Sequence, residues 1–384
     1  RSTLRQAIEL RAHDEGGIAS VRLELLEDAL REVGDVPRGD ANSAWVVRAE
    51  RLDAEAQSPQ SRLMLVRWLA ASWRFDEAEA ALGTISSDEV ALEGTNAIAQ
   101  AYGSAGRFDE AIPLYEKALA DNAHILGTVH PSILTTRNNL AVAYRVMGRL
   151  SEAIALFEEV VADSVRVLGP DRPQTLASRG NLAVAYQAAG RIDEAIPLYE
   201  EVAADSVRVL GADHPHTLVS RTNLAGAYRA AGRIDEAIPL YEDVLADHVR
   251  ILGADHPHTL VSRIDLAGAY RAAGRLGEAT TLFEGVLADH VRILGDDHPL
   301  TFTARNALAG TYQAAGRLSE AISLFEEALA GRMRILGPIH SDTLVSRSHL
   351  AYAYLEAGRV DDATAVLDPP TDPDDVDAHR IESR

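Results

Sequence analysis

The sequence from Val207 to Glu242 reads VRVLGADHPHTLVSRTNLAGAYRAAGRIDEAIPLYE, and it returns almost unchanged from Val249 as VRILGADHPHTLVSRIDLAGAYRAAGR. Tyrosines recur at intervals of 42 residues, and a Gly-Arg pair follows four residues after each: Tyr102, Tyr144, Tyr186, Tyr228, Tyr270, Tyr312 and Tyr354. A fixed period of this length is typical of a stacked repeat protein, in which one unit alone cannot bury its apolar face.

Each repeat is expected to contain two helices. The first runs from about Pro215 to Ala231, because proline suits the first turn of a helix and Gly232 can end it. The second is expected to begin with Asp235 as its N-cap and Glu236 in its first turn. A glycine is expected to end the second helix in every repeat: Gly127, Gly169, Gly211, Gly253, Gly295 and Gly337.

The apolar residues of both helices follow helical spacing. The predicted core faces are Leu224, Ala225 and Tyr228 on the first helix, and Ala237, Tyr241 and Val244 or Leu245 on the second. Stacked hairpins share one continuous core, so the sequence predicts an all-α, right-handed superhelical solenoid of antiparallel helical hairpins.

The pattern N-L-A-x-x-Y-x-x-x-G-R-x-x-E-A-x-x-L-x-E resembles the tetratricopeptide repeat, and it recurs seven times between about Leu92 and Leu367. The longer period, with LGxxHPxT between units, is similar to the kinesin light chain subtype. This chain has no motor-related segment, so the resemblance does not imply transport. One row departs from the subtype, which tends to be apolar there: Arg137, Arg179, Arg221, Arg263, Arg305 and Arg347.

The regular repeats are expected to occupy residues 91–367, after an irregular helical region at 1–57 and a shorter repeat at 58–90. In that shorter repeat, RFDEA at Arg74 matches RFDEA at Arg107, 33 residues later. The irregular region is either a cap or a linker from an upstream domain. Its candidate elements are helices at Leu4–Arg11, Ile18–Val33, Ser43–Ala56 and Gln60–Ser72, and a loop at Gly34–Asn42. The acidic, proline-rich stretch 368–384 is expected to be disordered.

Composition narrows the class of partner. The net charge is −21, so phosphate backbones and anionic membranes are unsuitable partners. No cysteine is present, which excludes disulfides and thiolate metal sites. No apolar run reaches membrane-spanning length and no signal peptide is seen, so we expect a cytoplasmic protein.

Lys117 is the only lysine, which is typical of a GC-rich bacterial genome. Because the chain begins at Arg1, we expect a fragment with a possible upstream domain.

The first-helix positions opposite the core form rows. The resemblance to tetratricopeptide proteins implies that this face lines a peptide-binding groove. A side-chain amide can hold an extended peptide backbone, and arginine can take carboxylates through two bonds. The amide row changes along the chain: Asn139, Asn181, Asn223, Asp265, Ala307 and His349. Next to it lie Val142, Val184, Gly226, Gly268 and Gly310, and at the edge Arg145, Gln187, Arg229, Arg271 and Gln313. The predicted site comprises Asn139, Asn181, Asn223, Asp265, Arg145, Arg229, Arg271, Gly226 and Gly268. In the alternative interpretation the amides hydrogen-bond the backbone of the neighbouring repeat and the glycines ease helix packing.

Two other rows are interpreted as structural. The arginine row is expected to pair with aspartates across each hairpin, as Arg137–Asp163, Arg179–Asp205, Arg221–Asp247 and Arg263–Asp289, whereas Arg305 faces Gly331 and lacks a partner. Histidines of one row cannot share a zinc ion, because equivalent residues of packed helices lie roughly 8–10 Å apart. The His-Pro pairs are expected to begin helices, and no metal is expected.

These patterns favour a protein- or peptide-binding module. Such arrays resemble the C-terminal sensor arms of signal-transducing ATPases and related regulators in GC-rich bacteria, which implies a ligand-sensing or scaffold arm of a larger bacterial signalling protein. The alternative is a structural scaffold that self-assembles. No phosphate loop, HExxH motif or nucleophile elbow occurs, so neither an enzyme nor a cofactor is expected. The identity of the ligand is not encoded in these patterns.

Overall fold

The computed structural model describes residues 41–126 and 130–367. The expected helices at Leu4–Arg11 and Ile18–Val33, the stretch 368–384 and Gly127 lie outside the described residues. Within them the chain is helical, and no strand occurs there. The helices are α3 Ala41–Ala56, α4 Pro59–Ala71, α5 Phe75–Leu82, α6 Asp88–Ser104, α7 Phe108–Leu126, α8 Pro131–Val146, α9 Leu150–Val167, α10 Pro173–Ala188, α11 Ile192–Leu210, α12 Pro215–Ala230, α13 Ile234–Leu252, α14 Pro257–Ala272, α15 Leu276–Leu294, α16 Pro299–Ala314, α17 Leu318–Leu336, α18 Ser341–Glu356 and α19 Val360–Leu367.

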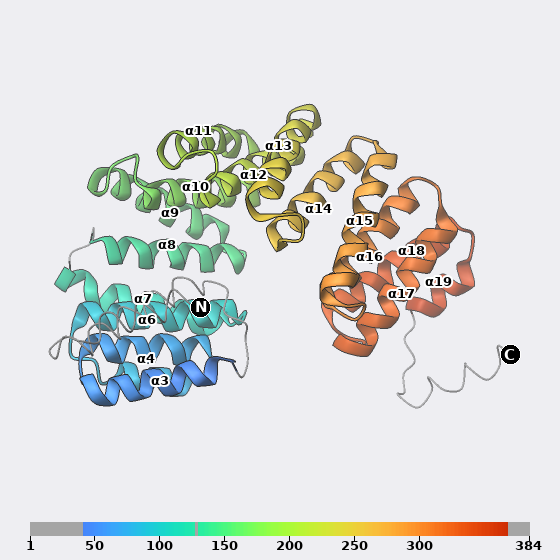
Figure 1. Cartoon of the computed structure of the whole chain (residues 1–384). Coiled ribbons are helices and arrows are strands. Elements are labelled where there is room, and N and C mark those ends of the chain that lie inside the picture. The colour runs from blue at the N-terminus through green and yellow to red at the C-terminus, as the bar shows by residue number, and fades with distance from the viewer. Residues whose placement is uncertain (1–40, 127–129, 368–384) are drawn as a thin grey trace. The chain divides into compact units, whose positions relative to one another are not determined.

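The chain divides into two compact units, residues 1–198 and 199–384. In each unit, helices that follow one another in sequence pack side by side, as α6 on α7 and α7 on α8 in the first, and α12 on α13 and α13 on α14 in the second. Figure 1 shows these hairpins stacked within each unit. The predicted all-α hairpin solenoid is therefore confirmed.

The turn inside each 42-residue hairpin depends on a glycine. Gly232 has a φ of 75°, in the left-handed region that favours glycine, and α12 ends just before it. The amide of Arg233 then donates to the carbonyl of Tyr228 at 2.8 Å. The expectation that Asp235 caps the second helix is wrong, because α13 begins one residue earlier with Arg233 at the cap position and no side-chain cap bond. Asp235 instead lies in the first turn, where its charge still favours the helix dipole.

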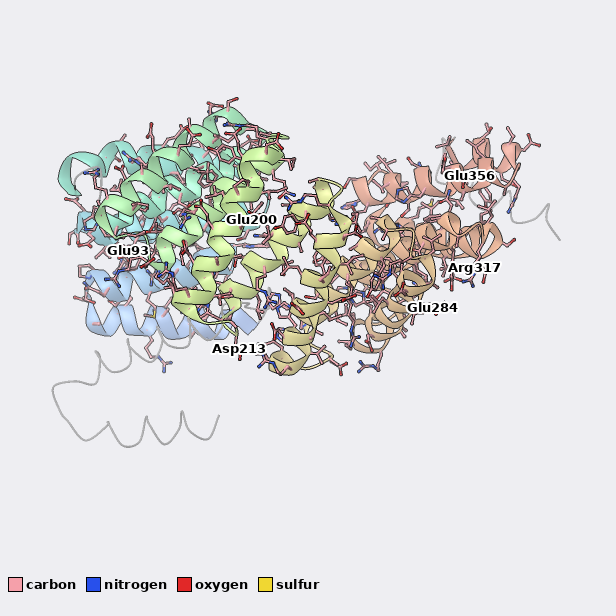
Figure 2. The ribbon with its side chains drawn as sticks, turned by 90° about the horizontal axis from the view of Figure 1, so that it is seen from above. Glu93, Glu200, Asp213, Glu284, Arg317 and Glu356 are labelled. Atoms are coloured by element: carbon pink, nitrogen blue, oxygen red, sulfur yellow. The ribbon has the colours of Figure 1, made fainter. Side chains whose placement is uncertain are left out.

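A cluster of four side chains ties each turn to its neighbours. The guanidinium of Arg233 lies 4.3 Å from the centre of the Tyr228 ring and donates to Glu236. The hydroxyl of Tyr228 donates to Glu200 at 2.7 Å, across 28 residues of sequence. Figure 2 labels Glu200 and the equivalent Glu284, which accepts from Tyr312. The tyrosine period in the sequence therefore marks a bond from one repeat to the preceding one.

The His-Pro pair begins the first helix of a repeat, as expected. The Nδ1 atom of His256 accepts from the amide of His258 at 3.2 Å, directly before Pro257 opens α14. The same cap is formed by His130, His214, His298 and His340. Histidine thus supplies the acceptor that serine or aspartate usually provides at this position.

Most of the predicted core residues are buried. Ala225, Ala237 and Val244 are fully buried, and Leu224 and Tyr241 nearly so. Tyr228 is only half-buried and packs against this cluster. The arginine row crosses each hairpin as predicted where the partners lie in one unit, at 3.1 Å for Arg137–Asp163 and 2.7 Å for both Arg221–Asp247 and Arg263–Asp289. Arg179 and Asp205 belong to different units, so that pair stays a prediction.

The expectation that Arg305 lacks a partner is wrong. Its side chain is buried and lies 2.5 Å from Asp296, with Glu327 at 3.4 Å. The reason is steric, because a Cβ atom added to Gly331 would come within 2.2 Å of the Phe302 ring. An aspartate cannot occupy that position beside Phe302, so the acid is supplied from the loop before α16 instead.

Candidate functional site

We use "groove face" for the first-helix positions of the three predicted rows. In the second unit these positions lie on α12, α14, α16 and α18. Asn223 and Asp265 are half-buried, whereas Arg229 and Arg271 are exposed. Gly268 has open space around it, since an added Cβ would meet nothing within 4 Å. That a ligand approaches this glycine closely stays a prediction.

Arg229 and Asp265 lie close to the hydroxyl of Tyr241, a side chain contributed by α13. Burial raises the pKa of Tyr241, while a hydrogen bond with Arg229 opposes that shift. Burial also raises the pKa of Asp265, and the positive charge of Arg229 opposes it. A Cβ added to Gly226 would lie 3.5 Å from the Tyr241 hydroxyl, an ordinary contact. Three predicted site residues, Gly226, Arg229 and Asp265, therefore surround one buried tyrosine.

Arg271 is one repeat further along and lacks an acid of this kind. Ala307 occupies the position that corresponds to Asp265, and Arg271 forms no ion pair with any residue that the structure describes. Its Nη1 atom would lie 3.2 Å from a Cβ added to Gly310, so the glycine makes room for the guanidinium. Burial lowers the pKa of His349, and the charges of Arg332 and Arg271 lower it further. Arg271 is thus an exposed cation near a histidine.

In the first unit, two predicted amides behave differently. The Nδ2 atom of Asn181 donates to the Oδ1 atom of Asn138 in the preceding repeat, at 3.2 Å. Asn181 therefore bonds the preceding repeat, but through a side chain and not through the backbone that the alternative interpretation names. The Nδ2 atom of Asn139 is buried and has no hydrogen-bond partner within residues 41–126 and 130–367. Arg145 is half-buried and, in the same ranges, forms no ion pair.

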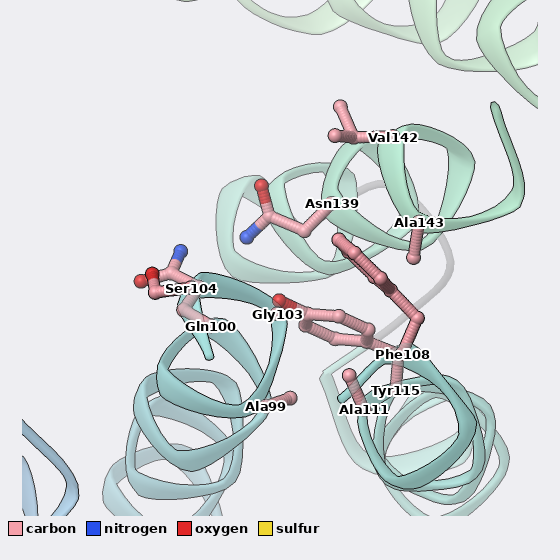
Figure 3. A pocket seen from close by; sticks show the side chains of 10 residues that line it. All are labelled: Ala99, Gln100, Gly103, Ser104, Phe108, Ala111, Tyr115, Asn139, Val142 and Ala143. Atoms are coloured by element: carbon pink, nitrogen blue, oxygen red, sulfur yellow. The ribbon is translucent and has the colours of Figure 1, made fainter. Parts of the chain in front are cut away.

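Asn139 lines a cavity of about 390 Å³ between α6, α7 and α8. Figure 3 shows the hydroxyl of Tyr115 and the amide of Asn139 on one side, facing Gln100 and Ser104. The remaining lining residues are Ala99, Gly103, Phe108, Ala111, Val142 and Ala143. Sequence reasoning missed this cavity, although one signal was present: Gly103 occupies the edge position that Arg145 occupies in the next repeat.

A second cavity, of about 420 Å³, lies between α5, α6 and α7 and is lined by charged side chains that include Glu79, Asp88, Lys117 and Asp121. No three His, Asp or Glu side chains among the described residues are grouped closely enough to hold a metal ion. In the same part of the chain, no helix is both long and apolar enough to cross a membrane.

Comparison with known proteins places these elements in a family. The model for the tetratricopeptide repeat matches six overlapping segments, residues 91–163, 132–205, 181–248, 220–288, 263–334 and 301–368. No curated protein sequence matches the chain. A solved structure of nearly identical repeats from a putative kinesin light chain of Podospora anserina is 39% identical, with a TM-score of 0.50, and the match covers 54% of this chain and 98% of that one.

Two other solved structures resemble the chain over most of its length. The apo quorum sensor NprR from B. thuringiensis has a TM-score of 0.63 at 15% identity, covering 92% of this chain and 98% of that one. A Rap protein complexed with Competence and Sporulation Factor has a TM-score of 0.54 at 10% identity, covering 95% and 97%. At these identities the likeness concerns the fold.

Proposed function

Because the chain belongs to the tetratricopeptide repeat family, we propose that the groove faces of its two units bind extended segments of a protein or peptide ligand. The edge arginines Arg145, Arg229 and Arg271 hold acidic groups of that ligand. The half-buried amides Asn139, Asn181 and Asn223 hold its backbone, because an amide offers both a donor and an acceptor.

The observation that carries this proposal is the contrast between two sets of arginines. Each arginine that follows a turn glycine pairs with an acid three residues later: Arg107, Arg149, Arg191, Arg233, Arg275, Arg317 and Arg359. The edge arginines Arg145 and Arg271 form no ion pair inside the described ranges, whereas Arg229 lies near Asp265 and bonds Tyr241. In a chain of net charge −21, cations without acids are unusual, and they are suited to carboxylates from outside.

The first test replaces Arg271 by glutamine and measures binding of an acidic peptide, selected from the proteins of the native host, by calorimetry. We expect about tenfold weaker binding, since a hydrogen bond to a charged group contributes about 1.5–3 kcal/mol. The matched control is Arg317→Gln, which removes a turn arginine paired with Glu320. Equal affinity of wild type and Arg271→Gln would show that Arg271 does not contact the ligand.

The second test addresses the amides. Replacing Asn181 and Asn223 together by alanine should weaken binding about tenfold, at ~1 kcal/mol per lost hydrogen bond. Because Asn181 bonds Asn138, each single variant is melted alongside the double variant. Loss of stability in Asn181→Ala without loss of affinity would assign that residue a structural role only.

We also propose that the module is the ligand-sensing or scaffold arm of a larger bacterial signalling protein. NprR, a quorum sensor of similar fold, supports this context. The full-length gene from the native host tests it: a phosphate-binding loop or another signalling domain in the same polypeptide is the expected finding. A gene that encodes the repeats alone would contradict it.

Self-assembly is a second candidate function, favoured by α18. On this helix two of the groove-face rows end in Tyr352 and Leu355, which are exposed together with the nearby Val345. Such side chains could contact a second copy of the chain.

A further inference from the structure

The cavity between α6, α7 and α8 exists because two residues of one repeat differ from their counterparts. Gly103 stands at the edge position of Arg145 and Arg229, and Gln100 stands at the position of Val142. An added Cβ at Gly103 would lie 3.4 Å from the Phe108 ring and would meet nothing closer. Position 103 could therefore carry a larger side chain, and the cavity is open because it does not.

One polar atom in the cavity is buried and has an unmet hydrogen-bonding capacity, because the Nδ2 atom of Asn139 has no partner within residues 41–126 and 130–367. Buried polar groups are nearly always hydrogen-bonded in native proteins, and an unmet group costs about 1–3 kcal/mol. A bound group that accepts from Asn139 would recover this free energy. Tyr115, which lines the same cavity, is 4% exposed, and its hydroxyl forms no hydrogen bond with a residue that the structure describes, so it is available to the same bound group.

The lining indicates the chemistry of that group. None of the ten lining residues is charged, so an ionised group would be desolvated without compensation. Two aromatic rings, Phe108 and Tyr115, and several alanine methyl groups provide surface for a flat apolar body. Asn139 offers a donor and therefore requires an acceptor, which excludes purely apolar groups and indole, whose nitrogen only donates.

We propose that this cavity binds a neutral phenol, and that its source is a tyrosine side chain of the peptide held on the groove face. The phenol oxygen accepts from the Asn139 amide and exchanges a hydrogen bond with the Tyr115 hydroxyl, while the ring packs against Phe108. The cavity volume of about 390 Å³ lies within the range of small-ligand pockets. The peptide source rests on the proposed function, whereas the phenol site itself does not.

The test uses p-cresol, which is the tyrosine side chain without its backbone, and follows NMR signals of the Ala99, Ala111 and Ala143 methyl groups in the full chain. We expect all three methyl signals to shift on titration. Toluene should bind more weakly, because it leaves the Asn139 amide unpartnered. Absence of shifts at these methyl groups up to the solubility of p-cresol would overturn the proposal.

Two variants make the test specific, and both place a side chain that other repeats already carry. Tyr115→Phe introduces the residue found at the equivalent positions Phe157 and Phe283. It should lower the affinity for p-cresol about fivefold and leave the affinity for toluene unchanged. Gly103→Arg introduces the side chain of Arg145 and should abolish binding of both. Tyr241→Phe in the second unit is the matched control and should leave p-cresol affinity unchanged. Equal p-cresol affinity in wild type and Tyr115→Phe would overturn the assignment of the hydroxyl.

Two further probes identify the bound group and its source. Propionamide represents a glutamine side chain. If it binds more tightly than p-cresol, the proposal that the bound group is a phenol is overturned. The tripeptide acetyl-Gly-Tyr-Gly-amide should bind more tightly than p-cresol if the source is a peptide. Binding of p-cresol without binding of the tripeptide would identify a free phenol and overturn the peptide source. These experiments use no partner protein. A negative result in the acidic-peptide assays can therefore be distinguished from a negative result for phenol binding in the cavity.

Discussion

At the scale of single residues, Arg305 shows how a repeat tolerates change. Its counterparts Arg221 and Arg263 pair with aspartates across the hairpin. Beside Arg305 that aspartate is replaced by Gly331, because the larger Phe302 fills the space. Asp296 supplies the acid instead, at the position that Ala254 occupies in the preceding repeat. Three linked substitutions thus preserve one buried charge with a partner.

Arg305→Ala should therefore destabilise the second unit by about 1–2 kcal/mol, comparable with Arg221→Ala, since each loses hydrogen bonds to a charged group and side-chain packing. Denaturant melts of both variants measure this. A double-mutant cycle with Asp296→Ala isolates the pair, and a coupling energy near zero would show that Asp296 does not stabilise Arg305.

Two buried histidines, His248 and His290, give the second unit a pH dependence of its own. Burial lowers the pKa of each below the ordinary value of 6.5. The unfolded chain therefore takes up protons at a higher pH than the folded chain does. The histidines cost no stability above pH 6.5, and stability falls as the pH drops from 6.5 toward the lowered pKa.

Serine occupies the equivalent positions Ser164 and Ser206. When both histidines are replaced by serine, the melting temperature should fall less as the pH is lowered from about 7 to 5. The comparison is with wild type in matched buffers, because carboxylates titrate in both proteins. Parallel pH profiles would show that these histidines do not account for the acid sensitivity. Charged and titratable neighbours that both proteins retain are His256, His258, Asp247, His298 and Asp289.

At the scale of the element, the helices of one repeat begin in different ways. The first helix opens on a histidine that caps it through Nδ1, followed by proline. The second opens directly from the left-handed glycine turn, and its arginine pairs with a glutamate in the first turn. Helix α10 lacks the histidine cap, since it has Arg172 at the cap position and no side-chain cap bond.

His256→Ala should destabilise the second unit by about 0.5–2 kcal/mol, and His256→Asn by less, because asparagine can accept the same bond. The reciprocal change, Arg172→His, should stabilise the first unit by a similar amount through a new cap on α10. Thermal melts followed by circular dichroism test all three. A destabilised Arg172→His variant would mean that the histidine cap depends on more than its position.

At the scale of the whole molecule, the charge and the exposed apolar side chains act in opposite directions. A net charge of −21 opposes association between copies of the chain. The exposed Val345, Tyr352 and Leu355 on α18 favour it. Ionic strength shifts the balance, because salt screens the repulsion and leaves the apolar contact.

Light scattering over a wide concentration range should give a monomer at low salt if peptide binding is the main function. If α18 drives self-assembly, a dimer should appear as salt rises, and Tyr352→Ser with Leu355→Gln should return it to a monomer. A dimer that persists in this double variant would place the contact elsewhere.

The sequence by itself determined the hairpin, its period and its core, because these depend on contacts that recur at fixed spacing. Leu224, Tyr228 and Ala237 are readable from one repeat. The groove rows were predicted from the same geometry, but their state depends on neighbours in other repeats: Asn181 bonds Asn138, Arg229 lies beside Tyr241, and Arg271 forms no pair with a described residue.

Only the tertiary structure decided which departures from the repeat pattern open a cavity or change a partner. The cavity at Tyr115 arises from the absence of a side chain at Gly103, and its walls come from three helices. The partner of Arg305 changed because Phe302 excludes the usual aspartate. A repeat pattern shows only the residues that its repeats share. When one residue differs from its counterparts, the resulting space or unpaired group depends on packing between residues far apart in sequence.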